Sequence, residues 1–214
     1  MKKYLATAVL VAALSPQVSS ANSFYVFGDY GVSKTRDGFK SNGSANTTDQ
    51  NVFNQIGLGY RYNEYLAFEG GYVNVGGRKF SLAPGSGFTA VSRTATDGSN
   101  VTANGSMQFN FKGLFAGVRG DYDLHGPWSL FGRAGIMAWD SEVELSDGGS
   151  INGNTVAAGT YDYDSGYSPY FAGGGELHLT PYLRANMQLS YYYFDHAGDP
   201  TGSTAISGGL LYEF

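Results

Sequence analysis

The residues of this sequence that could perform acid–base or nucleophilic chemistry are its three histidines. His125 falls in a short connection, His178 follows Glu176 in an alternating segment, and His196 comes directly after Asp195 in a loop. No nucleophile motif accompanies any of them, and an interior histidine of this kind is more often a satisfied polar group than a catalyst. The sequence therefore predicts that the protein is not an enzyme.

Patterns for metal and phosphate binding are incomplete. Asp162 and Asp164 have the spacing that begins a calcium loop, but the later ligands and the flanking helices are absent. The glycine-rich stretches FAGGGEL and GGYVNVGG lack a following helix, so they do not form phosphate loops. The chain has no cysteine, which excludes disulfides and thiolate chemistry. We expect no cofactor and no metal.

The first 21 residues have the pattern of a secretory signal peptide. Lys2 and Lys3 precede a short apolar stretch from Leu5 to Leu14, and small residues end the segment at Ala21. Residues 22–214 are then the mature chain, in which the 13 basic residues fall to 11 against 18 acidic ones, a net charge of about −7. Such a charge makes nucleic acid an unfavourable partner. After the signal, no apolar run is long enough for a membrane helix.

The remaining chain alternates apolar and polar residues with a period of two, which is typical of strands with two different faces. Eight such segments are separated by turn or loop signals. They lie at 23–34, 51–62, 65–76, 107–122, 128–143, 167–179, 182–194 and 206–214. In the fourth segment the apolar parity reverses near Lys112, which either a β-bulge or a strand end above a bilayer would explain.

The connections between these segments alternate in length. Those near 63–64, 123–127 and 180–181 are short, whereas 35–50, 77–106, 140–166 and 195–203 are long and polar. In an up-and-down meander, this alternation places all short turns at one end and all long loops at the other. The asymmetry is typical of outer-membrane barrels, so we expect an all-β fold, an eight-stranded antiparallel up-and-down transmembrane β-barrel.

The distribution of charge decides which face of such a barrel points outward. Charged residues lie on one face of the segments, interspersed with glycines, whereas tyrosines gather on the other face near the strand ends, as membrane interfaces require. We therefore expect the apolar face to contact lipid and the charges to pair inside, because an isolated buried charge is costly. The predicted interior network consists of Asp29, Arg61, Glu69, Arg119, Arg133, Glu176 and Arg184.

The last segment alternates up to the final residue. In hydrocarbon every backbone polar group needs an internal partner, so the last strand must pair with the first. Ile206, Leu210, Tyr212 and Phe214 form its apolar face. An aromatic terminus after such alternation resembles the recognition signal of the bacterial barrel-assembly machinery.

Four stretches carry a wider resemblance: LGYRYNEYLAFEGGY (58–72), VRGDYDL (118–124), FGRAGIMAWDSE (131–142) and DSGYSPYFAGGGELHLTPYLRANMQLSYYYF (164–194). They resemble the membrane domain of the OmpA-like family. The resemblance implies a monomeric barrel in a Gram-negative outer membrane, with periplasmic termini and extracellular long loops. The C-terminal peptidoglycan-binding domain of full-length OmpA is not part of the resemblance, so cell-wall anchoring is not implied.

The same resemblance assigns interior positions to Glu69, Arg119 and Glu176, where the family has an acid, a base and an acid. Asn186 stands where the family has a further arginine, and Arg184 is the candidate replacement. A fixed plug of ion pairs is one interpretation of this network. A switchable pair that opens a narrow conduit is the other.

These observations predict a non-enzymatic protein that supports the outer membrane and displays surface loops. A narrow channel and an OmpX-type adhesin, which would bind host or surface ligands through the long loops, are the alternatives. Outer-membrane lipid and lipopolysaccharide are the expected surroundings. Bases in the long connections could neutralise lipopolysaccharide phosphates; they are Lys34, Arg36, Lys40, Arg78, Lys79 and Arg93.

Overall fold

The computed structural model of the protein describes residues 22–36, 40–41, 46–48, 50–81, 87–91, 100–124, 126–151, 154–196 and 199–214. The predicted signal peptide, residues 1–21, and His125 lie outside these ranges.

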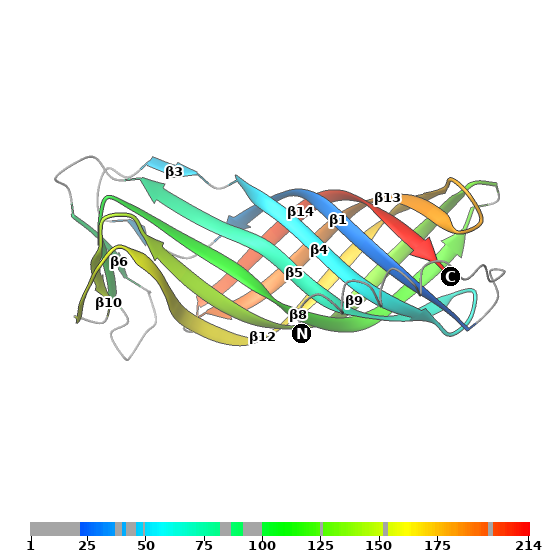
Figure 1. The fold of residues 1–214 in the computed structure, drawn as a ribbon, viewed down its shortest axis with the longest axis horizontal. Coiled ribbons are helices and arrows are strands. Elements are labelled where there is room, and N and C mark those ends of the chain that lie inside the picture. Colours follow the sequence, from blue (N-terminus) through cyan, green and yellow to red (C-terminus); the bar gives the residue numbers. More distant parts are fainter. Residues whose placement is uncertain are drawn as a thin grey trace, which may run out of the picture.

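Eight long antiparallel strands close into a barrel (Figure 1). They are β1 (Ser23–Arg36), β4 (Gln50–Arg61), β5 (Leu66–Ser81), β8 (Ser106–Asp123), β9 (Trp128–Leu145), β12 (Gly159–His178), β13 (Leu183–His196) and β14 (Asp199–Glu213). Each pairs with its neighbours in the up-and-down order, and β14 pairs with β1 to close the wall. The predicted eight-stranded antiparallel barrel is confirmed.

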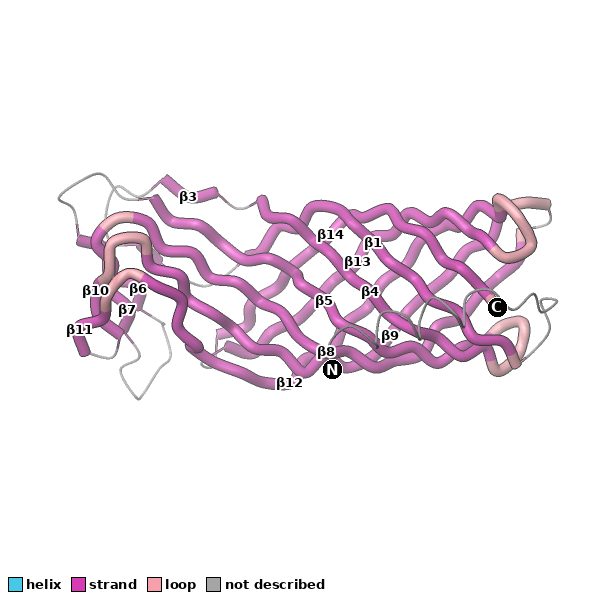
Figure 2. The backbone as a smooth tube through the Cα atoms, in the orientation of Figure 1, coloured by secondary structure: helices cyan, strands magenta, loops and turns pink. Residues whose placement is uncertain are grey.

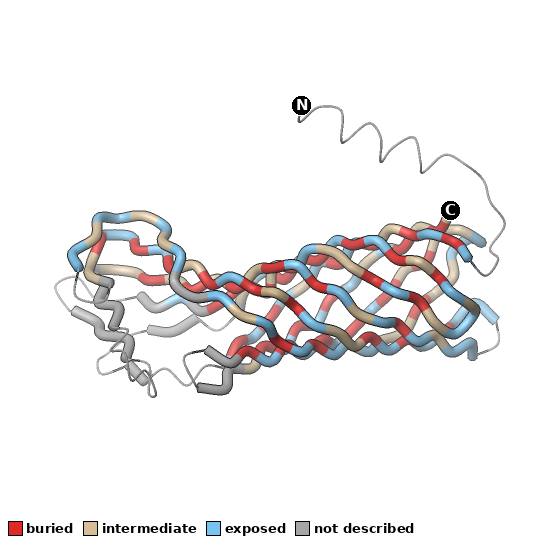
Figure 3. Tube along the Cα trace, turned by 90° about the horizontal axis from the view of Figure 1, so that it is seen from below, coloured by how far each residue is buried: buried red, intermediate tan, exposed pale blue. Residues whose placement is uncertain are grey.

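The two-residue alternation of the sequence becomes an alternation of burial along every strand of the barrel (Figure 3). Ile56 is 65% exposed on the outside, whereas its neighbour Gln55 is 5% exposed and points inward. The apolar outer band on β9 runs from Leu130 to Ala138, close to the roughly 9–11 residues with which a tilted strand crosses a bilayer. Among the described residues, no helix is long and apolar enough to span a membrane.

Tight turns lie at one end of the barrel, which we call the short-turn end (Figure 2). In the turn between β4 and β5, the Asn63 side-chain oxygen accepts hydrogen bonds from the backbone N–H groups of Tyr65 and Leu66, both at 2.9 Å. Thr180 accepts two comparable bonds in the turn between β12 and β13. In both turns a side-chain oxygen accepts hydrogen bonds from the backbone N–H groups two and three residues later, in place of a backbone carbonyl oxygen. This local hydrogen bonding allows so short a connection.

The opposite end, the long-loop end, contains more regular structure than the polar sequence of its connections predicts. A second sheet is formed there by β2 (Lys40–Ser41), β6 (Gly87–Val91), β7 (Asn100–Asn104), β10 (Gly149–Ile151) and β11 (Asn154–Val156). The short strand β3 (Asn46–Thr48) pairs with β5. The four strands β5, β8, β9 and β12 also continue past the apolar band, so one side of the wall is taller than the other (Figure 1).

The apparent change of parity near Lys112 is not a reversal of β8. Met107, Phe109 and Phe111 are buried and point inward, as Phe115 and Arg119 do further along the same strand. A bulge does lie beside Lys112, but it belongs to β5, where the register shifts between Asn74 and Gly76. The parity change therefore reflects a change in the interior, which becomes apolar toward the long-loop end.

Candidate functional site

All seven charged residues of the predicted interior network lie inside the barrel, and none is more than 9% exposed. Asp121 and Glu213 join them, and each of the eight barrel strands supplies at least one member. The charges meet because each occupies an inward-facing position of its strand, in the half toward the short-turn end. We call these nine residues the ionic network.

Six members of the ionic network alternate in charge around a closed ring. Arg119 Nη2 lies 2.6 Å from Asp121 Oδ1 and 2.6 Å from Glu176 Oε2. Arg61 contacts the other oxygen of Asp121 at 2.9 Å and Glu213 at 3.2 Å. Arg184 completes the ring, at 2.6 Å from Glu213 and 3.6 Å from Glu176. Every guanidinium of the ring therefore lies between two carboxylates.

Arg133 forms a branch of the ionic network. Its Nε atom lies 2.9 Å from Glu69 Oε2, and its Nη1 atom lies 3.5 Å from Asp29 Oδ2. Glu69 also accepts a 2.8 Å hydrogen bond from the Tyr25 hydroxyl. Aromatic faces cover the guanidinium groups, because Phe131 lies 4.4 Å from the Arg119 Cζ atom and 4.9 Å from that of Arg133. Such cation–π contacts stabilise charges that water does not reach.

The bore between the ionic network and the long-loop end is filled by rings. The rings of Tyr170 and Tyr192 stack at 5.8 Å, and those of Phe111 and Phe194 stack at 4.8 Å. The Trp139 ring meets the Phe194 ring edge-on at 5.6 Å. We call these five residues the aromatic layer. Each is at most 2% exposed, so the layer excludes water from this part of the bore.

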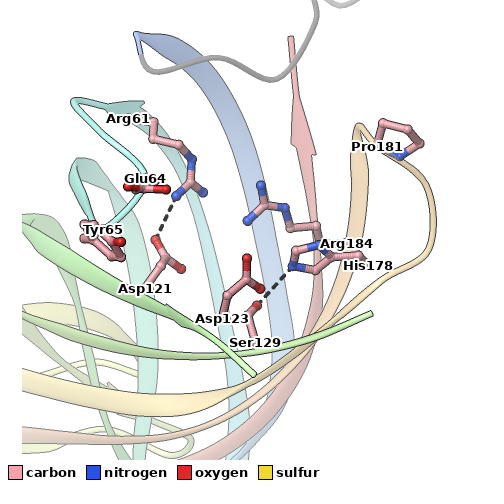
Figure 4. Close-up of a pocket in the computed structure, with 9 residues that line it drawn as sticks. All are labelled: Arg61, Glu64, Tyr65, Asp121, Asp123, Ser129, His178, Pro181 and Arg184. Carbon is pink, nitrogen blue, oxygen red and sulfur yellow. Dashed lines mark hydrogen bonds and ion pairs between the residues drawn. The ribbon is translucent and has the colours of Figure 1, made fainter. Parts of the chain in front are cut away.

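A pocket of about 400 Å³ opens at the short-turn end, beneath the ionic network (Figure 4). Its lining consists of Arg61, Glu64, Tyr65, Asp121, Asp123, Ser129, His178, Pro181 and Arg184. We call it the mouth pocket. Tyr65, its aromatic residue, belongs to the turn between β4 and β5. The Tyr65 hydroxyl donates a hydrogen bond to Glu64, which raises the pKa of that hydroxyl.

The mouth pocket brings a serine next to a histidine, a contact that sequence reasoning missed. Ser129 Oγ lies 3.1 Å from His178 Nε2. Asp123 on β8 stands opposite Ser129 on β9, and His178 lies on β12, on the other side of β9. Across the three strands, the serine therefore lies between the aspartate and the histidine. A hydrolytic triad needs the histidine between the carboxylate and the serine. Ser129 and His178 are therefore paired as in a catalytic dyad, but Asp123 lies on the wrong side of the serine to complete a triad.

Other predicted positions are not gathered into a site. Asp162 is exposed on β12, the side chain of Asp164 lies outside the description, and no cluster of metal-ligating side chains occurs within the described ranges. The side chain of His196 is likewise outside the description. Of the bases proposed for lipopolysaccharide, Lys34 and Lys79 are exposed, whereas the side chains of Arg36, Lys40, Arg78 and Arg93 are not described.

With this geometry in place, comparison with known proteins identifies the family. Residues 19–213 match the profile of the OmpA-like transmembrane domain. The chain belongs to this family. It is therefore a transmembrane β-barrel of the outer membrane, and the resemblance stated from the sequence is confirmed.

The OmpA-like relatives are distant in sequence. Outer membrane protein A of Klebsiella pneumoniae is 29% identical over 89% of this chain, and that of Shigella flexneri is 28% identical over 98%. The chain spans about half the length of these relatives, 49% and 53%. The crystal structure of Neisserial surface protein A has a TM-score of 0.58 at 18% identity, covering 89% of this chain and 97% of its own. That likeness supports the fold alone.

The position at which this OmpA-like chain lacks an arginine can now be placed in space. Asn186 is buried on β13, opposite Glu176 on β12. Arg184, the predicted replacement, does contact Glu176, but at 3.6 Å, and its shorter contact is with Glu213. The closer base for the second family acid, Glu69, is Arg133 on β9. Glu69 and Glu176 therefore each have two arginines within 3.9 Å, although position 186 carries no charge.

Proposed function

We propose that the protein is a sealed structural barrel that supports the outer membrane and holds its long-loop end at the cell surface. Residues 1–21 are removed as a signal, the short turns and both ends of the mature chain face the periplasm, and the barrel is a monomer. The observation that carries the proposal is the filled bore, because the ionic network and the aromatic layer are two independent seals in series.

Energetics support a fixed plug. Removing one partner of a buried ion pair leaves an uncompensated charge, at a cost of about 3–5 kcal/mol. In the ring, each arginine would have to leave two carboxylates at once. The resting state is therefore closed.

A narrow channel is the second candidate, because the family resemblance suggests a switchable pair. The aromatic layer argues against it, since opening the ionic network would leave Phe111, Phe194 and Trp139 in the path. An adhesin would need the long loops to bind a receptor. Deletions within the connections that the sequence predicts to be long, followed by a measurement of cell adhesion, test that role directly.

Two measurements test the proposal. Fractionation combined with unheated and heated gel mobility tests the location and the closed barrel, which migrates differently when folded. Planar-bilayer recordings on Glu69→Gln and Arg119→Ala test the seal. We expect no conductance beyond that of the unaltered protein, and conductance only when Phe111→Ala and Phe194→Ala are added. Conductance after the ionic substitutions alone would replace the plug with a gate.

A further inference from the structure

The mouth pocket contains two kinds of charged groups, those engaged within the ionic network and those that are free. Asp121 accepts hydrogen bonds from Arg61 and Arg119. Arg184 lies between the carboxylates of Glu213 and Glu176. These groups are already neutralised by their neighbours, so they offer a ligand little net charge. The recognition chemistry of the pocket therefore depends on the remaining groups.

The free negative groups lie at the outer part of the pocket. Glu64 and Asp123 are both exposed, and neither forms an ion pair within the described part of the chain. They belong to different elements, Glu64 to the turn after β4 and Asp123 to the end of β8. Tyr65 stands beside Glu64 with 61% of its surface exposed. Glu64 and Asp123 thus place uncompensated negative charge at two sides of the pocket (Figure 4), which favours a small cation such as an ammonium group.

A free donor lies on the inner wall. Arg61 is only 5% exposed, and its Nε and Nη1 atoms bind Glu213 and Asp121. Its Nη2 atom has no hydrogen-bond partner among the described residues. Figure 4 shows the guanidinium groups of Arg61 and Arg184 directed toward each other across the pocket, above Asp123. A buried donor without a partner is unfavourable, and an anionic oxygen would satisfy it.

We propose that the mouth pocket binds a small zwitterion, an amino-carboxylate, with its ammonium group at Glu64 and Asp123 and its carboxylate toward Arg61. A simple amine would leave the free donor of Arg61 unpaired, and a simple carboxylate would meet the uncompensated carboxylates of Glu64 and Asp123. Only a ligand with both charges complements both regions. Ser129 and His178 also line the pocket and supply a hydroxyl and an imidazole for further hydrogen bonds. The site does not depend on the bore being sealed.

The separation of the two charges can be measured with a series of ω-amino acids. We would titrate the ¹⁵N-labelled barrel in detergent micelles with glycine, β-alanine, 4-aminobutanoate and 6-aminohexanoate, and follow the amide signals of the mouth-pocket residues by NMR. Acetate and ethylammonium are the matched half-ligands. We expect saturable shifts that are strongest for one chain length, with both half-ligands at least roughly tenfold weaker.

Asp123→Asn and Glu64→Gln should each weaken the best ligand by roughly tenfold, because each removes one charge-assisted contact. Asp140→Asn, an exposed acid on β9 beyond the apolar band, is the matched control and should leave the affinity unchanged. Gel mobility of each variant confirms that the barrel has closed. Absence of saturable shifts with all four zwitterions would overturn the proposal. Half-ligands that bind as tightly as the zwitterion, or variants that bind unchanged, would also overturn it.

Discussion

Arg119 and Glu176 lie 2.6 Å apart in the bore, at a depth where neither side chain has any exposed surface. Their strands, β8 and β12, are not adjacent in the wall, because β9 lies between them. The contact therefore spans the inner face of β9 and joins two strands that no backbone hydrogen bond connects.

Removing Arg119 should destabilise the barrel strongly. Arg119→Met leaves Glu69, Asp121 and Glu176 with one base fewer, and we expect the free energy of unfolding to fall by about 3–5 kcal/mol. Urea unfolding in lipid vesicles measures it. The matched control is Lys112→Met, whose pair with Glu142 is partly exposed, so its loss should cost no more than about 1 kcal/mol. Equal losses in the two variants would mean that the buried ring contributes no more than a surface pair.

Gly59 should be required for barrel closure. A Cβ atom there would meet the ring of Tyr25, which is fully buried and donates to Glu69, so Gly59→Val forces that ring out of place. We expect most of the variant to lack the folded gel mobility. Gly120→Val is the control, because a Cβ atom at Gly120 points outward and meets nothing closer than 3.8 Å. A fully folded Gly59→Val barrel would show that the interior repacks freely.

Labelling can test the outward apolar face directly. The chain has no cysteine, so single cysteines can be introduced at the neighbouring positions Gln55 and Ile56. A fluorophore on Ile56→Cys, which replaces a side chain that is 65% exposed, should be quenched by spin-labelled lipid. A thiol at Gln55→Cys points into the bore and should resist modification until the protein is unfolded. The opposite result would place the polar face toward lipid.

The terminal aromatic residue should matter more for assembly in the cell than for final stability. The Phe214 N–H donates to the Phe24 carbonyl oxygen at 2.9 Å, and its ring lies 5.7 Å from that of Tyr212. Only the end of one strand depends on these contacts. We expect deletion of Phe214 to lower the amount of barrel in the outer membrane several-fold, while refolding into detergent remains efficient. Equal losses in both measurements would indicate a structural role instead of a recognition signal.

The period of two was sufficient to predict the barrel strands and their faces. Strands such as β4 and β13 follow the predicted segments within a few residues at each end, because burial of one face in lipid makes the alternation strict. The alternation is less informative beyond the membrane. There β5 and β12 continue into stretches that the sequence assigns to connections, 77–81 and 159–166, yet these stretches pair with β8 and β9. Local composition cannot reveal such pairing, because the partner is distant in sequence.

The predicted site shows a similar limit. Charges on inward faces near the short turns indicate the ionic network, but the sequence does not determine which arginine meets which acid. Arg133 on β9 contacts Glu69 on β5, and β8 lies between these two strands. The pairing of Ser129 with His178 was missed because the hydroxyl belongs to another strand. The aromatic layer had a detectable signal, since Tyr192 and Phe194 fall on the same face as Gln188 and Ser190.

The unequal height of the wall makes two sides of the barrel different at the long-loop end. On one side, β5, β8, β9 and β12 remain paired with one another beyond the apolar band, toward the long-loop end. On the other side, the pairing of β12 with β13 extends toward that end only as far as Tyr170 and Tyr192. A large molecule that approaches along the membrane plane meets a high wall on the side of β8 and β9 and a low wall on the side of β13. We therefore expect a neighbouring molecule in the membrane to come closer to the apolar band on the side of β13 than on the side of β8 and β9.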